Sequence, residues 1–361
     1  MDLELRPVTE EELEAYLRVD STAFGQAPPD ADDAAVARAQ LGPLERALAV
    51  FEGGRIVATA AAPPLELTLP GLTTTTVAAL TYVGVLPTHR RRGLLRLMMG
   101  RLLEDARARG EAVALLLASE SAIYGRFGYG LASSHVAVEI ERRHGALLVP
   151  EGRGRVELVD AGTAAKVLPA VHDQARRRQP GDLGRSAEWW EGALRDPEPR
   201  REGASPRFYA VHESAEGEAD GYASYRVKSR WEHGMPCGRV LVQEVVALSP
   251  GADAALWRFL LSIDLTEVVE AESRPVEDPL RWMLADPRRL RVTMASDFLW
   301  ARLLDVGAAL AARRYAVPGR LVLDVDGGFG APGGRRYALE GGPDGAGCRP
   351  TDDDADLALG L

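Results

Sequence analysis

The sequence predicts a mixed α/β protein with several domains, and three observations support this prediction. The chain has 361 residues, which is too long for one ordinary hydrophobic core. Short apolar segments rich in β-branched residues alternate with segments whose apolar residues recur at helical spacing. The order apolar strand, proline, turn and amphipathic helix occurs at residues 77–103 and again at residues 240–265.

Composition excludes several classes of protein. With 46% hydrophobic and 27% charged residues, the chain is typical of globular proteins, and its net charge of −10 argues against nucleic acid as a partner. Cys237 and Cys348 are far apart and lie in no CxxC motif, so we expect neither a disulfide framework nor a metal site. The acidic N-terminal segment resembles no signal peptide, and no apolar run could span a membrane. We therefore expect a cytoplasmic protein without membrane partners.

The first domain is expected to cover residues 1–148. Pro87 ends its central strand, and Gly110 ends the helix that follows, in which apolar residues recur every three or four positions. Residues 28–33, rich in Pro and Asp, are expected to be mobile. The predicted strands are 4–8, 48–51, 55–63, 65–69, 77–85 and 113–118, with helices at 9–19 and after Gly93.

The second domain, expected at residues 149–288 after a linker at 149–155, contains the second copy of the repeated order. Its loop at 251–254 has no arginine and carries Asp253, which would repel a phosphate. This favours a degenerate copy of the first domain, and an unrelated α/β unit is the alternative.

The third domain is expected at residues 289–361. It would begin with a helix across residues 292–316, in which Leu303, Leu304, Val306 and Ala309 face a core. Residues 319–328 and 334–342 are predicted to form strands of an antiparallel sheet, and the last residues of the sequence are also strand-like.

The segment 82–95, YVGVLPTHRRRGLL, carries the most functional information. A helix N-terminus presents unpaired N–H groups and a partial positive charge, so the amides near Arg91 and Leu95 could bind a diphosphate. Gly93 would let the ligand approach the backbone, and Arg91 and Arg92 would add charge. An exposed basic patch is the competing interpretation. The segment has neither the G-x-G-x-x-G nor the GxxxxGK[ST] pattern.

Two motifs carry a resemblance to a known family. Residues 90–95, RRRGLL, resemble the [Q/R]-x-x-G-x-[G/A] pyrophosphate loop of GCN5-related N-acetyltransferases, although Leu95 replaces the small last residue. Residues 119–130, SESAIYGRFGYG, are similar to the Eis (enhanced intracellular survival) family within that superfamily. Further family-like segments, GYASYRVK among them, extend the resemblance over almost the whole chain.

The resemblance implies a fold and a co-substrate. The fold would be α/β (α+β), with tandem acetyltransferase-like folds, the second degenerate, followed by a sterol-carrier-protein-like domain that ends incomplete at residue 361. Acetyl-CoA would be the co-substrate, and no metal is implied. The residues expected to contact it are Val83, Gly84 and Val85 through their backbones, Arg91, Arg92 and Gly93 at the turn, Leu94, Leu95 and Arg96 in the first helical turn, and Ser119 and Glu120 after the next strand.

The resemblance also implies an activity. Tyr124 would be the catalytic general acid, because a phenol with a pKa near 10 can protonate a leaving thiolate whose thiol has a pKa near 8.5. The acceptor would be a primary amine of a cationic small molecule, such as an aminoglycoside, and the enzyme would be a homohexamer. Protein lysine is the alternative acceptor, and a non-enzymatic protein that binds CoA or lipid is the alternative class. A DNA-binding regulator is disfavoured by the net charge.

The general base stays open at this point. The family uses a C-terminal carboxylate, but Leu361 falls in a strand-like segment. We therefore expect either that the chain continues beyond Leu361 or that another group is the base.

Overall fold

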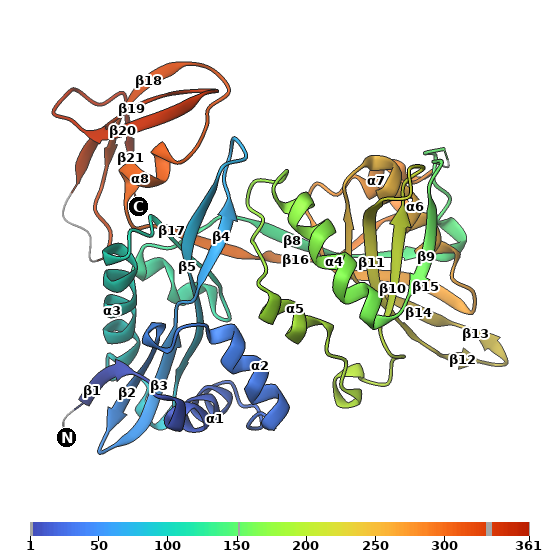
Figure 1. Cartoon of the computed structure of the whole chain (residues 1–361), viewed down its shortest axis with the longest axis horizontal. Helices are drawn as coiled ribbons and strands as arrows, with labels where there is room; N and C mark the ends of the chain where they lie inside the picture. Colours follow the sequence, from blue (N-terminus) through green and yellow to red (C-terminus); the bar gives the residue numbers. More distant parts are fainter. Residues whose placement is uncertain (1–2, 151, 330–333, 361) are drawn as a thin grey trace. The chain divides into compact units, whose positions relative to one another are not determined.

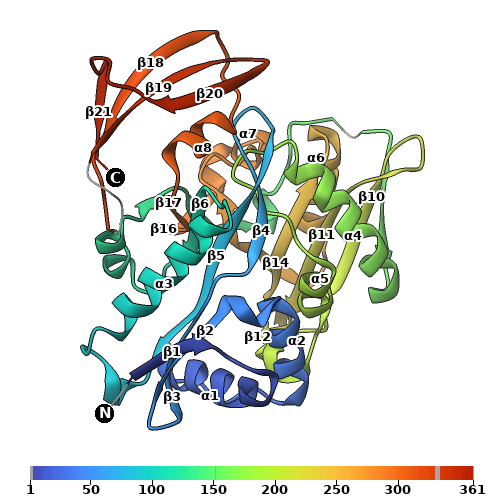
Figure 2. The same cartoon turned by 60° about the vertical axis from the view of Figure 1, so that its left-hand side comes forward.

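The computed structural model describes residues 3–150, 152–329 and 334–360, and these residues form two compact units. The first unit contains residues up to Ser133, Arg177–Trp189 and residues from Phe298 onward. The second contains Ser134–Arg176 and Trp190–Asp297. Both units combine a sheet with helices (Figures 1 and 2). The division into domains at residues 148 and 288 stays a prediction. Glu151 of the expected linker and Leu361 lie outside the described residues.

The main sheet of the first unit has the order β1-β2-β3-β5-β6-β17-β7, and β4 pairs with β5. Its strands are β1 (Leu3–Pro7), β2 (Ala47–Glu52), β3 (Arg55–Ala61), β4 (Pro64–Thr68), β5 (Thr74–Val85), β6 (Val113–Leu117), β7 (Gly130–Leu131) and β17 (Leu299–Leu303). Its helices are α1 (Leu13–Ala23), α2 (Ala31–Leu41), α3 (Leu94–Ala108) and α8 (Val306–Ala311).

Helices cover both faces of this sheet, as the alternation of side chains along β2 requires. Leu48 and Val50 join the core that contains α3, whereas Ala49 and Phe51 join the core that contains α1. The helices α1 and α3 therefore pack on opposite faces of the sheet.

The same unit holds a smaller sheet of order β20-β19-β18-β21. Its strands are β18 (Gly319–Val325), β19 (Arg335–Gly342), β20 (Gly345–Pro350) and β21 (Leu357–Leu359). The strands β18 and β19 are antiparallel, as predicted.

The second unit is built on a sheet of order β16-β8-β15-β14-β11-β10-β9. Its strands are β8 (Ser134–Glu141), β9 (Arg155–Val159), β10 (Phe208–Glu213), β11 (Ala219–Lys228), β14 (Gly238–Ala247), β15 (Thr266–Pro275) and β16 (Arg291–Asp297), and β12 (Trp231–Glu232) and β13 (Met235–Pro236) form a hairpin. Its helices include α4 (Ala161–Arg176), α6 (Pro250–Ser262) and α7 (Leu280–Met283), and α5 spans Ala187–Leu194.

One local prediction was wrong, and a helix starts within one segment for which no helix was predicted. The helix expected across residues 292–316 is replaced by β16, β17 and the short helix α8, because β16 pairs with β8 and β17 pairs with β6. Long-range backbone pairing here overrides a local helical pattern. The segment 28–33, expected to be mobile, contains the start of α2, where the Asp30 carboxylate accepts from Asp33 N–H.

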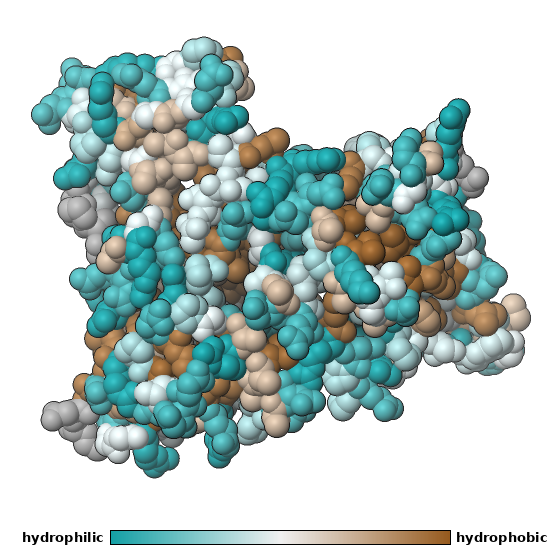
Figure 3. Space-filling view, in the orientation of Figure 1, coloured by the Kyte–Doolittle hydropathy of each residue, from teal (hydrophilic) through white to brown (hydrophobic). Residues whose placement is uncertain are grey.

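One face of the molecule is mostly polar. Figure 3 shows hydrophilic residues over much of the face in view, with smaller apolar areas between them. Among the described residues, no helix has the length and apolar character needed to cross a membrane.

Candidate active site

The central strand β5 continues for five residues beyond its pairing with β6. The two parallel strands pair only at Ala78–Leu80 of β5, although β5 continues to Val85. On its other side β5 stays paired with β3, where Thr59 lies opposite Gly84. The backbone of Val83, Gly84 and Val85 therefore lacks a neighbouring strand on the β6 side, so an amide-containing chain could pair there.

The turn between β5 and α3 leaves the first amides of the helix uncapped. The N-cap is Gly93, with φ of 82°, and no side chain accepts a hydrogen bond from the helix start. The first recorded bond of the helix runs from Leu97 N–H to the Gly93 carbonyl, so the amides of Leu94, Leu95 and Arg96 precede the regular ladder. A Cβ at Gly93 would meet nothing within 4 Å, so an anion can approach the backbone.

The arginines of this turn differ in their partners. Arg92 forms an ion pair with Glu52 at 2.5 Å, and His89 Nε2 lies 2.9 Å from the same carboxylate. The hydrogen bond from Arg92 lowers the pKa of Glu52 to about 2, and His89 contributes further. Arg91 has a φ of 62° and makes no ion pair or side-chain hydrogen bond with the described residues. Arg90 donates to the carbonyls of Ala23 and Val85, so Arg91 is the arginine of this turn whose side chain has no recorded hydrogen bond or ion pair with the described residues.

This difference predicts that Arg91→Ala weakens CoA binding more than Arg92→Ala does. A charge-assisted hydrogen bond is worth about 1.5–3 kcal/mol, so we expect a roughly 10- to 100-fold higher Kd for Arg91→Ala in calorimetry. Acetyl-pantetheine, which lacks the pyrophosphate, is the control ligand, and its Kd should not change. Equal losses with both ligands would contradict a phosphate contact.

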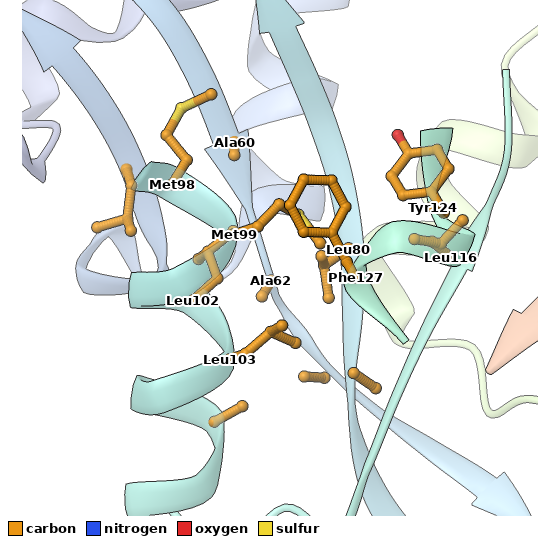
Figure 4. Close-up of a cluster of buried hydrophobic side chains, with 14 of the residues drawn as sticks. Ala60, Ala62, Leu80, Met98, Met99, Leu102, Leu103, Leu116, Tyr124 and Phe127 are labelled. Carbon is orange, nitrogen blue, oxygen red and sulfur yellow. The ribbon is translucent and has the colours of Figure 1, made fainter. Parts of the chain in front are cut away.

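The loop after β6 brings Tyr124 to the same edge of the sheet, because β5 and β6 are parallel. Ser119 and Glu120 are exposed just after β6, and Tyr124 is buried at the end of the short 3₁₀ turn Ser121–Ile123 that follows. Burial raises the pKa of Tyr124 above 10, and the charge of Glu120 raises it further. Figure 4 shows the Tyr124 ring beside Leu116 and Phe127, with its hydroxyl pointing away from Leu116. The phenol therefore stays protonated at neutral pH.

Two further aromatic residues belong to this loop. Tyr129 packs edge-on against Tyr124 with 6.1 Å between the ring centroids, and its buried hydroxyl has no hydrogen-bond partner. Phe127 is 3% exposed and belongs to the core that includes α3. Both residues pack into the hydrophobic core of the first unit.

A residue that was not predicted from the sequence, Arg302, supports this loop through hydrogen bonds. Arg302, on β17, donates to the carbonyl oxygens of Phe127 and Phe329, and the two phenylalanine rings are 5.0 Å apart and perpendicular. Burial lowers the pKa of Arg302 to about 10, and the charge of Arg107 lowers it further, so the side chain stays charged at neutral pH. The sequence does show an arginine within an apolar segment. Because that segment was expected to be a helix, the sequence did not indicate that the Arg302 side chain would reach this loop.

A groove of about 850 Å³ runs along α3 from the turn. Gly93, Arg96 and Phe329 line it, whereas residues 82–85 do not. The groove therefore adjoins the phosphate end of the predicted site and not its thioester end. Among the residues described, no cluster of three His, Cys, Asp or Glu side chains could hold a metal ion.

The corresponding helix of the second unit has a different N-terminus. Ser249 caps α6 by accepting from Ala252 N–H, and Asp253 is half-buried in the first turn of the helix. Burial raises the pKa of Asp253 to about 6, although the positive charge of Arg274 opposes the shift. The side-chain cap and the acidic residue make this helix start a poor anion site.

Comparison with known proteins agrees with this architecture. Two family profiles, each described as "Acetyltransferase (GNAT) domain", match residues 4–132 and 181–303. An uncharacterised N-acetyltransferase of Streptomyces avermitilis is 40% identical over 99% of this chain and 87% of its own. N-acetyltransferase Eis of Mycobacterium tuberculosis is 35% identical over 91% of this chain and 80% of its own. The crystal structure of Eis1 from Mycobacterium abscessus has a TM-score of 0.84 and 32% identity, covering 99% of this chain and 87% of that one.

The fold and the comparisons define an acetyl-CoA-dependent N-acetyltransferase with two GNAT domains. The chain belongs to the Eis family of GCN5-related N-acetyltransferases. The second repeat is thus a GNAT domain and not an unrelated α/β unit.

Proposed function

We propose that the enzyme transfers an acetyl group from acetyl-CoA to a primary amine of a cationic small molecule, such as an aminoglycoside, with Tyr124 as the general acid. The observation that carries this proposal is the protonated Tyr124 phenol at the edge where β5 separates from β6. The net charge of −10 favours a cationic acceptor.

The residues of the first unit support direct transfer. The backbone of Val83, Gly84 and Val85 would bind the pantetheine arm, and the start of α3, with Arg91, Arg92 and Gly93, would bind the pyrophosphate. Leu94, Leu95 and Arg96 would supply the helical amides, and Ser119 and Glu120 would contact the CoA after β6. A neutral amine attacks the thioester carbon, the C–S bond breaks and Tyr124 protonates the sulfur. The proton that the nitrogen loses restores the phenol.

The test is thiol release from acetyl-CoA with a panel of aminoglycosides, polyamines and lysine peptides. We expect saturable release with polycationic small molecules and acetylated product of the corresponding mass. A preference for lysine peptides would instead indicate that the acceptor is a lysine of a protein. Release that never exceeds the amine-free background would contradict the proposal.

The remaining family traits belong to the same proposal. Residues from Gly319 onward would form a sterol-carrier-protein-like domain, the second GNAT domain would bind no acetyl-CoA, and the enzyme would be a cytoplasmic homohexamer. Light scattering at micromolar concentration should then give six times the mass of one 38.9 kDa chain. A monomeric mass would contradict the hexamer.

A further inference from the structure

We propose that Phe329, which lies between β18 and β19, holds the Arg96 side chain in place to bind the 3′-phosphate of CoA. The inference rests on the proposed function, in which the start of α3 binds the pyrophosphate. It gives a role to the groove along α3, since both side chains line it. Phe329 acts through Arg96 and is therefore a positioning residue.

The groove begins at the pyrophosphate end of the site. Gly93 lines it at the start of α3, and Arg107 lines it near the end of the helix. Residues 83–85, along which pantetheine would lie, do not line it. On the other side of its pyrophosphate, CoA carries a 3′-phosphorylated adenosine. This is the end of CoA that can enter the groove, whose volume of about 850 Å³ is in the usual range for small-molecule sites.

The arginines that line the groove differ in their partners. Arg101 forms an ion pair with Asp105 at 2.9 Å, and Arg107 donates to the carbonyl of Leu304 at 3.3 Å. Arg96 is exposed, and its side chain makes no hydrogen bond or ion pair with the described residues. Its guanidinium therefore keeps all its donors for an anion, and a phosphate is the anion that such a fork binds best.

The carboxylate that lines the groove is remote from this position. Glu104 follows Arg96 by eight residues on α3, which is about 12 Å along the helix axis. A phosphate bound by Arg96 would lie near the positive end of the helix dipole and away from Glu104. The charges of the groove thus favour an anion at the end nearest Gly93.

The ring of Phe329 fixes the Arg96 guanidinium. The Cζ atom of Arg96 lies 5.2 Å from the centroid of this ring, which is the geometry of a cation–π contact. Such a contact uses none of the N–H donors. An arginine already held in one position loses less conformational entropy when it binds a phosphate. Phe329 therefore raises the affinity for CoA without touching it.

Phe329 is itself well anchored. Its ring packs perpendicular to that of Phe127, with 5.0 Å between the centroids, and its carbonyl accepts from Arg302. The Arg302 guanidinium also lies 5.7 Å from the centroid of the Phe329 ring. The smaller sheet thus contributes, next to β18, a fixed residue to the wall of the groove.

The first test is calorimetry with CoA and 3′-dephospho-CoA. The wild type should bind CoA about tenfold or more tightly than 3′-dephospho-CoA. Arg96→Ala should lose this preference, with a higher Kd for CoA and an unchanged Kd for 3′-dephospho-CoA. Arg91→Ala should weaken both ligands, because both contain the pyrophosphate. Arg101→Ala, which removes another arginine of the groove, is the matched control and should behave as the wild type.

Two outcomes of this test would overturn the inference. One is a wild type that binds both ligands equally. The other is an Arg96→Ala protein that loses affinity for both ligands to the same extent, which would assign Arg96 to the pyrophosphate.

The second test addresses Phe329. Phe329→Leu removes the aromatic face and should raise the Kd for CoA by about threefold to tenfold, with no change for 3′-dephospho-CoA. Phe329→Tyr keeps the ring and should retain the wild-type preference. In an Arg96→Ala background, Phe329→Leu should cause no further loss of CoA affinity. A purely structural role would weaken both ligands in either background, and that result would overturn the positioning role. Phe329→Met gives the same test if Phe329→Leu does not fold.

These measurements need neither an acceptor nor turnover. Silence of the wild type in the thiol assay would remove the proposed function, whereas a preference for CoA that is lost in Arg96→Ala would still support the 3′-phosphate site. Turnover with equal KM values for acetyl-CoA and its 3′-dephospho analogue would overturn the inference and leave the proposed function intact.

Discussion

Replacing Tyr124 with phenylalanine is expected to lower kcat by about 10²- to 10⁴-fold, the usual contribution of a positioned general acid. The phenol lies at the edge where β5 and β6 separate, and burial followed by the charge of Glu120 raises its pKa above 10. An acid with a raised pKa keeps its proton until the pH exceeds that value. The wild type should therefore show no loss of activity from Tyr124 at or below pH 10. Steady-state kinetics across pH 7–10 with a fixed amine measures both effects.

Tyr129→Phe is the matched control for this variant. Tyr129 packs against Tyr124 in the same loop, but its buried hydroxyl has no partner, so removing it breaks no hydrogen bond. We expect a kcat within about twofold of wild type and no loss of stability. CoA affinity should be unchanged in both variants. If Tyr124→Phe behaves like Tyr129→Phe, Tyr124 is a packing residue.

Arg302→Met is expected to lower the free energy of unfolding by about 3 kcal/mol or more and to reduce kcat at least tenfold. The change leaves the carbonyls of Phe127 and Phe329 without their charged donor, and hydrogen bonds to charged groups are worth about 1.5–3 kcal/mol each. The loop that carries Tyr124 would lose its support from β17. Urea unfolding, together with kcat at saturating acetyl-CoA, measures the two losses.

Arg126→Met separates this effect from a general loss of charge. Arg126 belongs to the same loop and also donates to a carbonyl, that of Ile123, but it is exposed to solvent. Its replacement should change stability by about 0.5 kcal/mol or less. An Arg302→Met protein as stable as Arg126→Met would show that β17 does not support the loop.

The sequence predicted well those parts of the site that depend on neighbouring residues. Pro87, Gly93 and the apolar residues at helical spacing define the end of β5 and the start of α3, because each acts on its own turn of backbone. The helix predicted after Gly93 begins at Leu94, and the strands β5 and β6 lie where they were expected.

The sequence could not predict features that depend on distant partners. The segment around Arg302 looks helical locally, but its pairing with β6 makes it a strand. The same holds for charge: Arg91 and Arg92 look equivalent in the sequence, and the contact with Glu52 on β2 distinguishes them.

The pairing of β17 with β6 also affects how the chain folds during synthesis. The strand β6 ends at Leu117, but its partner is complete only when Leu303 has been made. At a translation rate of roughly 5–20 residues per second, this interval lasts about 10–40 s. During that time one edge of β6 lacks its final partner, and unpaired strand edges invite association with other chains. We expect ribosome-bound chains that end before residue 299 to be more sensitive to protease and to chaperone depletion than chains extended past Leu303.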